Sequence, residues 1–287
     1  MGIIPPEYKR CTPVWALPQA VKMPPMTDIH AAAQIGFGTE AQSYAKGRPE
    51  YPADLLGWLA KDLGLGSRAA ALDLGAGTGK FTRLLRQTGA QVLAVEPVEA
   101  MRQQLARAMP DVQLHSGTAQ AIPLPDASVD AVLCAQAFHW FATAQALREI
   151  HRVLRPGGKL GLVWNVRDES VDWVAAITAI ITPYEGDAPR FYKGDWRTPF
   201  ADAAAAALFG PLVRSDFSYE HAGPAQEVII DRFLSVSFIA ALPPDDKARV
   251  NDQLHALIAR NPALRGQPRI AFPYQTQAYC CTRRTLA

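Results

Sequence analysis

The chain has 287 residues, of which 49% are apolar and 20% charged, and its 29 Lys and Arg nearly balance its 27 Asp and Glu. This composition is typical of a globular protein, long enough for one large domain or a core domain with a substantial addition. No stretch approaches the ~18 consecutive apolar residues of a membrane span. No basic run provides the electrostatic pattern of a nucleic-acid-binding protein. We therefore expect neither a membrane protein nor a nucleic-acid partner.

The N-terminal segment and the cysteines both indicate a cytoplasmic setting. Residues 1–25 contain several prolines and charged residues, without the apolar core and the cleavage site of a secretory signal. The four cysteines include the adjacent pair Cys280 and Cys281 and form no recognisable disulfide framework. We expect residues 1–25 to be a disordered or extended arm outside the fold.

From Tyr51 onward, short apolar runs alternate with stretches of helical spacing, a pattern typical of a parallel sheet covered by helices. Strands are expected at 70–74, 91–95, 112–115, 129–135 and 159–164. Helices are expected between them at 53–63, 80–88, 99–108 and 143–154. Further on, helical spacing is found at 171–181, 201–208, 224–242 and 244–260, and strand-like runs at 212–219 and 271–282. This pattern predicts a core over 26–164, followed by a helical cap with the final strands over 165–287.

The most informative motif is LDLGAGTGK at 72–80, which places three glycines directly after a strand and before a helix. Such a loop lets a nucleotide-like ligand approach the backbone and the N–H groups of a helix N-terminus. A phosphate-binding loop of the GxxxxGK[ST] type would need glycine at 74 and Ser or Thr at 81, where the chain has Leu74 and Phe81. A dinucleotide fingerprint would need glycine at position 80, where the chain has Lys80. A nicotinamide enzyme is therefore the weaker alternative.

Two acids bracket this loop: Asp73 precedes it, and Glu96 ends the next expected strand. With these acids, with SGTAQAIPLPDASVDAVLCAQAFHWF at 116–141 and with LRPGGKL at 154–160, the chain resembles the class I S-adenosylmethionine (SAM) dependent methyltransferases. The segments YAKGRPEYP, WNVRD and RFLSVSFIAALP, which begin at positions 44, 164 and 232, resemble the Methyltransferase type 11 group that includes trans-aconitate methyltransferase-like proteins.

The resemblance implies an α/β, Rossmann-like fold with a mostly parallel sheet of seven strands, the last antiparallel near 274–282, and SAM as the cofactor. SAM carries an adenosine, a sulfonium and a methionine tail but no phosphate, so acids and backbone amides suit it. Glu96 can accept hydrogen bonds from both ribose hydroxyls, and Asp73 can face the ligand ammonium. The family pattern implies further cofactor contacts from Tyr44, Arg48, Gly75, Ala76, Gly77, Gly79, Pro97, Met101, Thr118, Ala119, Gln136 and Ala137.

The implied reaction is methyl transfer to a small-molecule acceptor, in which the protein mainly positions the two reactants. A general base matters only where the acceptor must lose a proton. His139 lies after the fourth strand, at the sheet edge where open parallel sheets bind ligands, and is the candidate base. A structural role in the pocket wall is its alternative. No histidine or cysteine spacing typical of a metal site occurs, so we expect no metal.

The acceptor and its reacting atom do not follow from the sequence. The signature of exocyclic-amine methylation is missing, because Gln136 and Ala137 begin a different sequence at that place. Resemblance to carboxylate-methylating relatives favours a carboxylate, and Arg167 after the fifth strand can either orient an anionic acceptor or form a surface ion pair. A SAM-binding regulator or partner subunit without transferase activity is the alternative function. The oligomeric state is equally open.

Overall fold

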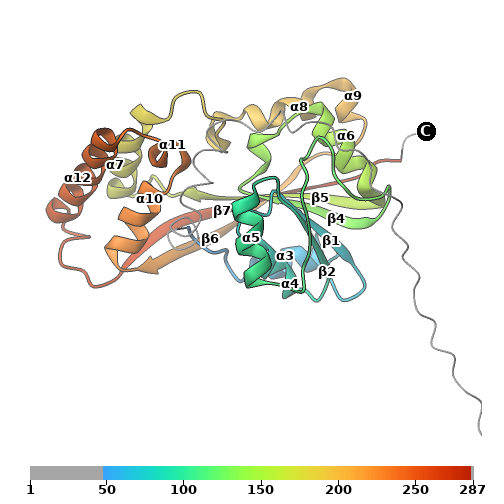
Figure 1. The fold of residues 1–287 in the computed structure, drawn as a ribbon, viewed down its shortest axis with the longest axis horizontal. Coiled ribbons are helices and arrows are strands. Elements are labelled where there is room, and N and C mark those ends of the chain that lie inside the picture. Colours follow the sequence, from blue (N-terminus) through green and yellow to red (C-terminus); the bar gives the residue numbers. More distant parts are fainter. Residues whose placement is uncertain (1–47, 286–287) are drawn as a thin grey trace, which may run out of the picture.

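The computed structural model describes residues 48–285 of the chain, so the arm expected at 1–25 and the expected cofactor contact Tyr44 lie outside the described residues. Within the described range, seven strands form one sheet in the order β3-β2-β1-β4-β5-β7-β6 (Figure 1). Their bounds are β1 Ala70–Leu74, β2 Gln91–Val95, β3 Gln113–His115, β4 Val129–Ala135, β5 Leu154–Arg167, β6 Val213–Gly223 and β7 Ile270–Thr282. The pairs among β1 to β5 are parallel, whereas β7 runs antiparallel to both β5 and β6. The predicted sheet with a reversed last strand is confirmed.

The central strands are apolar on both sides because helices cover both faces of the sheet. Leu72 and Val132 face one apolar cluster, and their neighbours Ala71 and Leu133 face another. The first cluster contains α6 Ala144–Val153, beside which lie α8 Thr198–Ala201 and α9 Ala203–Ala206. On the other face lie α3 Leu55–Lys61, α4 Lys80–Arg86 and α5 Glu99–Ala108. This layering places the end of β1 and the beginning of α4 at the rim of the sheet.

Two predicted elements differ from the observed ones for local reasons. The strand expected at 159–164 is longer, Leu154–Arg167, and contains an irregularity where the register with β4 shifts and Gly157 has a φ of +76°. The helix expected at 201–208 is broken between α8 and α9 at Asp202, whose backbone is extended. Asp202 is the N-cap of the second helix, and its carboxylate accepts a hydrogen bond of 3.0 Å from the N–H of Ala205 in the first turn.

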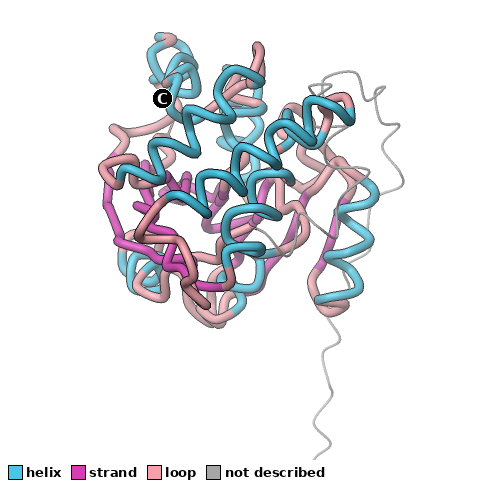
Figure 2. Tube along the Cα trace, turned by 90° about the vertical axis from the view of Figure 1, so that its left-hand side faces the viewer, coloured by secondary structure: helices cyan, strands magenta, loops and turns pink. Residues whose placement is uncertain are grey.

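A group of helices, here called the cap, packs on the ends of β6 and β7 at one end of the molecule's long axis (Figure 1). Its members are α7 Asp172–Ile181, the π-helix η5 Gln226–Asp231, α10 Arg232–Leu234, α11 Ser237–Ala240 and α12 Pro244–Arg260. They share an apolar cluster of their own, which includes Ile177, Phe233, Leu254 and Phe272. Figure 2, in which this end faces the viewer, shows the helices crossing in front of the strands. The stretch predicted as one helix at 224–242 is thus three short elements, interrupted by the extended backbone of Val236.

Short 3-10 helices connect the larger elements: η1 Phe138–Trp140, η2 Thr182–Tyr184, η3 Phe191–Lys193 and η4 Asp195–Arg197. Of these, η1 directly follows β4, so it brings the FHWF motif to the same sheet edge as the glycine loop. Among residues 48–285, no helix is both long and apolar enough for a membrane span.

Candidate active site

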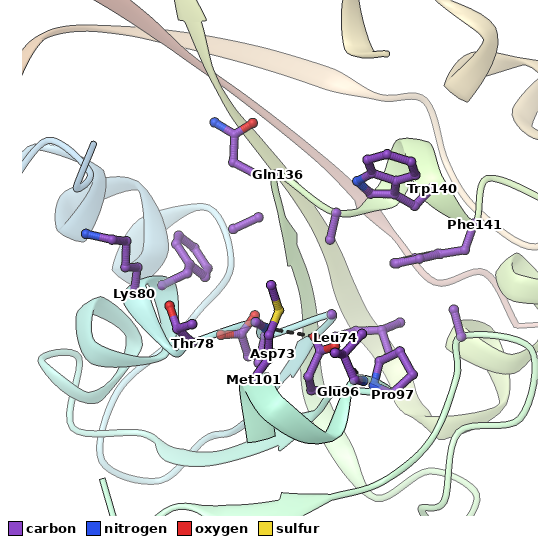
Figure 3. A pocket seen from close by; sticks show the side chains of 18 of the residues that line it. Asp73, Leu74, Thr78, Lys80, Glu96, Pro97, Met101, Gln136, Trp140 and Phe141 are labelled. Atoms are coloured by element: carbon purple, nitrogen blue, oxygen red, sulfur yellow. Dashed lines mark hydrogen bonds between the residues drawn. The ribbon is translucent and has the colours of Figure 1, made fainter. Parts of the chain in front are cut away.

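A pocket lies at the carboxyl ends of β1, β2 and β4, where the strand order of the sheet reverses between β1 and β4. Open α/β sheets bind ligands at this position. The pocket encloses about 1200 Å³, partly open to solvent. Twelve of the residues expected to contact a cofactor line it: Arg48, Asp73, Gly75, Ala76, Gly77, Glu96, Pro97, Met101, Thr118, Ala119, Gln136 and Ala137. Figure 3 shows Asp73, Glu96 and Met101 close together on one side of this pocket, with Gln136 and Trp140 across from them.

All three glycines of the loop have a positive φ, a backbone conformation that other residues rarely adopt. Gly75 has a φ of +75°, and a Cβ there would lie 2.8 Å from the Cβ of Ala137. Gly79 has a φ of +86° at the start of α4 and packs against Leu105 of α5 and against Met109, which directly follows α5. Gly79 does not line the pocket. Gly79 thus packs between α4 and α5, and its contact with a cofactor stays a prediction.

Asp73 presents an unsatisfied oxygen in this pocket. The residue is 1% exposed, and its Oδ2 accepts a hydrogen bond of 2.6 Å from the Thr82 hydroxyl. Its Oδ1 is buried and has no hydrogen-bond partner within the described part of the chain. Burial raises the pKa of the Asp73 carboxyl to about 7, and the negative charge of Glu96 adds to this effect. A buried carboxylate of this kind is stabilised by a ligand that brings a cation or a hydrogen-bond donor.

Glu96 is held rigidly at the end of β2. Its Oε2 accepts a hydrogen bond of 2.8 Å from the N–H of Gly77, and its Oε1 accepts one of 2.9 Å from the N–H of Val98. Burial raises the pKa of this carboxyl as well. Each oxygen keeps a further lone pair, so the carboxylate can still accept hydrogen bonds from ligand hydroxyls.

The two acids also decide against a phosphate-bearing ligand. In a phosphate-binding loop the backbone N–H groups point at the ligand, whereas here the Gly77 amide already donates to Glu96. A phosphate would in addition meet two buried carboxylates of the same charge. The pocket therefore suits a phosphate-free ligand with hydroxyl and cationic groups, and the nicotinamide alternative loses support.

The pocket lining also contains residues whose roles the sequence did not reveal. Trp140 and Phe141 of the FHWF motif line the pocket, as do Thr78 and Arg232. The only sequence signal that places these two aromatic side chains at the pocket is the position of FHWF directly after a strand. Gln136 has a φ of +56°, an uncommon conformation for a residue other than glycine, of the kind that concentrates at functional sites.

His139 does not line the glycine-loop pocket; it lines a second pocket on the far side of Trp140. Its Nδ1 accepts a hydrogen bond of 3.1 Å from the Nε1–H of Trp164, so the proton of the neutral ring lies on Nε2. Burial lowers the pKa of His139 to about 3, and the charges of Arg190 and Arg48 lower it further. The geometry therefore favours a structural role for this ring over that of a general base.

The second pocket encloses about 920 Å³, partly open to solvent, and is rich in arginine. It shares Arg48, Gln136, Trp140 and Arg232 with the glycine-loop pocket. Four arginines line it, Arg48, Arg167, Arg190 and Arg232, against the two acids Glu169 and Glu185. The lining thus carries an excess of positive charge, next to the pocket that contains the two buried acids.

Arg167 and Arg190 each lie close to an acid. Nε of Arg167 lies 3.6 Å from Oε1 of Glu169, and Nε of Arg190 lies 3.9 Å from Oε2 of the buried Glu185. The guanidinium of Arg190 also lies over the ring of Phe238, 4.5 Å from its centroid. Burial lowers the pKa of both arginines, because the interior disfavours their charged form. Both therefore favour an additional anion in the pocket.

Within the described residues, no group of His, Cys, Asp and Glu side chains is placed to hold a metal ion.

The comparisons with known proteins agree with this geometry. Residues 72–162 match the family model described as a methyltransferase domain. An uncharacterized methyltransferase-like protein of Schizosaccharomyces pombe is 38% identical over 244 residues, which cover 85% of this chain and 93% of that protein. An uncharacterized methyltransferase of Mycobacterium bovis is 38% identical over 263 residues, covering 91% of this chain and 100% of that protein. A solved structure from Anabaena variabilis, assigned as a methyltransferase of an antibiotic biosynthesis pathway, shares the fold with a TM-score of 0.55 at 20% identity, covering 85% of this chain and 100% of that one.

Proposed function

The chain belongs to the class I SAM-dependent methyltransferase family, and we propose that it methylates a carboxylate oxygen of a small-molecule acceptor. The observation that carries the proposal is the junction of the two pockets. A pocket with two buried acids borders a pocket with an excess of arginines, and the two share four lining residues.

The glycine-loop pocket fits SAM because its polar groups without a full set of hydrogen-bond partners match the polar groups of SAM. Asp73 Oδ1, buried without a partner within residues 48–285, would pair with the ammonium of the methionine moiety. Glu96, fixed by two backbone amides, would accept from the ribose hydroxyls. Met101 and Ala119, which line the pocket, would provide apolar contact for the adenine. Bound SAM supplies a methyl group on a sulfonium; its transfer to a carboxylate oxygen forms one C–O bond, breaks one C–S bond with the electron pair left on sulfur, and moves no proton.

The arginine-rich pocket supports an anionic acceptor. Guanidinium groups recognise carboxylates through paired hydrogen bonds, and burial strengthens this preference. An amine that is cationic before reaction would instead be repelled by Arg167, Arg190 and Arg232. A carboxylate is already ionised at neutral pH, so it needs no base to become nucleophilic.

The state of His139 agrees with an acceptor of this class. Its Nδ1 lone pair is taken by Trp164 and its Nε2 carries the proton, so accepting another proton would break the hydrogen bond and charge a buried ring. An alcohol or phenol would need that proton acceptor, whereas a carboxylate does not. The protein then contributes position and charge, with the arginines holding the acceptor against the cofactor pocket.

Two measurements test the proposal in sequence. Isothermal titration with SAM and with S-adenosylhomocysteine establishes cofactor binding, and the proposal is wrong if neither binds at millimolar concentration. The protein is then incubated with SAM and a panel of small carboxylic acids, phenols and amines, and the products are identified by mass spectrometry. We expect methyl esters. Products only from phenols or amines would contradict the carboxylate, and cofactor binding without any product would indicate a non-catalytic SAM-binding protein.

A further inference from the structure

Arg232 occupies a distinctive place at the boundary of the two pockets. It is the first residue of α10, it lines both the glycine-loop pocket and the arginine-rich pocket, and it is 8% exposed. Its Nε and Nη1 are buried and have no hydrogen-bond partner among residues 48–285. Within that range no carboxylate forms an ion pair with it, in contrast to Arg167 and Arg190.

This unpaired state is energetically unfavourable in the ligand-free protein. A buried guanidinium loses its hydration, and the loss is offset only where an anion and hydrogen-bond acceptors replace the water. The neighbouring side chains do not supply such an anion. Instead, the positive charges of Arg167 and Arg190 interact unfavourably with that of Arg232. The ring of Phe233, 5.3 Å from the guanidinium, provides only a weak cation–π contact. The side chain is therefore arranged for an anion that enters from outside.

The π-helix explains how the chain directs this side chain into the site. η5 contains a wider turn than an α-helix, and such turns occur frequently at functional sites because they shift the direction of the side chains that follow. On either side of Arg232, the buried Ile230 and Phe233 are fixed in the apolar cluster of the cap. With these two anchors in place, Arg232 is left on the side that faces the pockets.

We propose that Arg232 binds the reacting carboxylate of the acceptor at the boundary between the two pockets, a role that rests on the proposed function. Its planar fork holds the carboxylate in a fixed orientation beside the cofactor pocket. Esterification removes the negative charge of the carboxylate, so Arg232 binds the acid much more strongly than the ester. The same residue thereby selects the ionised acceptor and releases the neutral product.

The test uses binding, so that it does not depend on knowing the natural acceptor. Thermal unfolding of the purified full chain is followed with acetate, malonate, benzoate and citrate as probes, each compared with sodium chloride at equal ionic strength. We compare the wild type with Arg232→Met, which removes the charge but keeps much of the apolar stem. Arg249→Met on α12 is the matched control, because Arg249 is 61% exposed and pairs with Asp246 away from both pockets.

For the wild type and for Arg249→Met, we expect at least one carboxylate to raise Tm by on the order of 5 °C at a concentration well above its Kd. Arg232→Met should lose this rise, and Arg232→Lys should keep part of it. General salt effects act equally on all variants and cancel in the comparison. The proposal is overturned if Arg232→Met responds as the wild type does, or if no probe stabilises the wild type.

A titration with S-adenosylhomocysteine distinguishes a failure of the Arg232 proposal from a failure of the proposed function. Arg232→Met should bind S-adenosylhomocysteine within about threefold of the wild type, because Asp73 and Glu96 are unchanged. Loss of that binding only in the variant would assign Arg232 to the cofactor and overturn the proposal. A wild type that does not bind S-adenosylhomocysteine would contradict the proposed function, independently of the carboxylate shifts. Once an acceptor is identified, Arg232→Lys should raise its KM about 10- to 100-fold, more than it lowers kcat.

Discussion

The indole Nε1 of Trp164 donates a hydrogen bond of 3.1 Å to Nδ1 of His139, and this bond joins the end of β5 to the loop after β4. Trp164 is 1% exposed and lies in the main apolar cluster. The histidine that sequence position marks as a base therefore serves as the acceptor for a buried donor.

Replacing His139 should consequently affect stability more than chemistry. His139→Ala leaves the Trp164 N–H unsatisfied, and we expect a loss of about 1–3 kcal/mol in the free energy of unfolding. His139→Asn retains an acceptor near the Nδ1 position and should recover part of this loss. In both variants kcat at pH 7.5 should stay within about tenfold of the wild type, because general-base catalysis typically contributes 10²- to 10⁴-fold. A much larger loss of kcat in the well-folded His139→Asn variant would restore His139 as the base.

Asp73 should make cofactor binding depend on pH. Its pKa of about 7 means that the carboxyl is largely neutral below pH 7, where it no longer attracts the ligand ammonium. We therefore expect the Kd for SAM, measured by isothermal titration, to rise up to tenfold per pH unit as the pH falls below 7. Asp73→Asn should bind SAM weakly at every pH. A wild-type Kd that is constant between pH 6 and 8 would contradict this assignment.

The same carboxyl affects the stability of the ligand-free protein in the opposite direction. Because its pKa is raised in the folded state, the folded protein binds more protons than the unfolded chain between pH 3.8 and about 7. The contribution of Asp73 to stability is therefore lost as the pH rises through this window. At pH 8 the ligand-free Asp73→Asn variant should be more stable than the wild type, by up to a few kcal/mol. Equal stabilities at pH 8, measured by urea unfolding, would show that Asp73 is not destabilised by burial.

An isosteric substitution of Thr82 should shift the pH dependence of SAM binding. Its hydroxyl donates the 2.6 Å hydrogen bond that lowers the pKa of Asp73 against the effect of burial. Thr82→Val removes the donor with little change in volume, so the pKa of Asp73 should rise further. We expect SAM binding to weaken at pH 7 and to recover at a higher pH. If binding is weakened equally from pH 7 to pH 9, Thr82 affects the site through packing instead.

The sheet and the glycine-loop pocket followed from the sequence because their signals are local. The strands at 70–74, 91–95 and 129–135 have the expected bounds, since each is a mainly apolar run followed by a polar or flexible residue. Asp73 and Glu96 lie at fixed distances from one glycine loop, so their convergence could be inferred from spacing. The break between α8 and α9 is also local, because Asp202 accepts a hydrogen bond from the N–H of Ala205. The run of alanines at this place nevertheless favours a prediction of one continuous helix.

The arginine-rich pocket could not be inferred in the same way. Arg48, Arg167, Arg190 and Arg232 come from four separate segments, and no spacing relates them. Arg167 reaches the pocket because β5 extends to it through its pairing with β7, and Arg232 follows a π-helix. A π-helix has no sequence pattern distinct from that of an α-helix, and the stretch at 224–242 was accordingly predicted as one helix. Of these four, the sequence suggests only Arg167 for an anionic acceptor.

Alanine substitutions at Gly75 and Gly64 form a matched pair. Comparing them separates the cost of backbone strain from the cost of a steric clash between the glycine loop and Ala137. Both have a positive φ, +75° and +68°, so alanine is strained at either position. A Cβ at Gly64 meets nothing within 4 Å, whereas a Cβ at Gly75 would lie 2.8 Å from that of Ala137. We expect Gly64→Ala to lose about 1–2 kcal/mol of stability and to retain SAM affinity. Gly75→Ala should lose more stability and also weaken SAM binding at least tenfold, because the loop must move away from Ala137 at the pocket wall. Chemical unfolding and isothermal titration of both variants measure the two effects; equal SAM affinities would show that the pocket tolerates this movement.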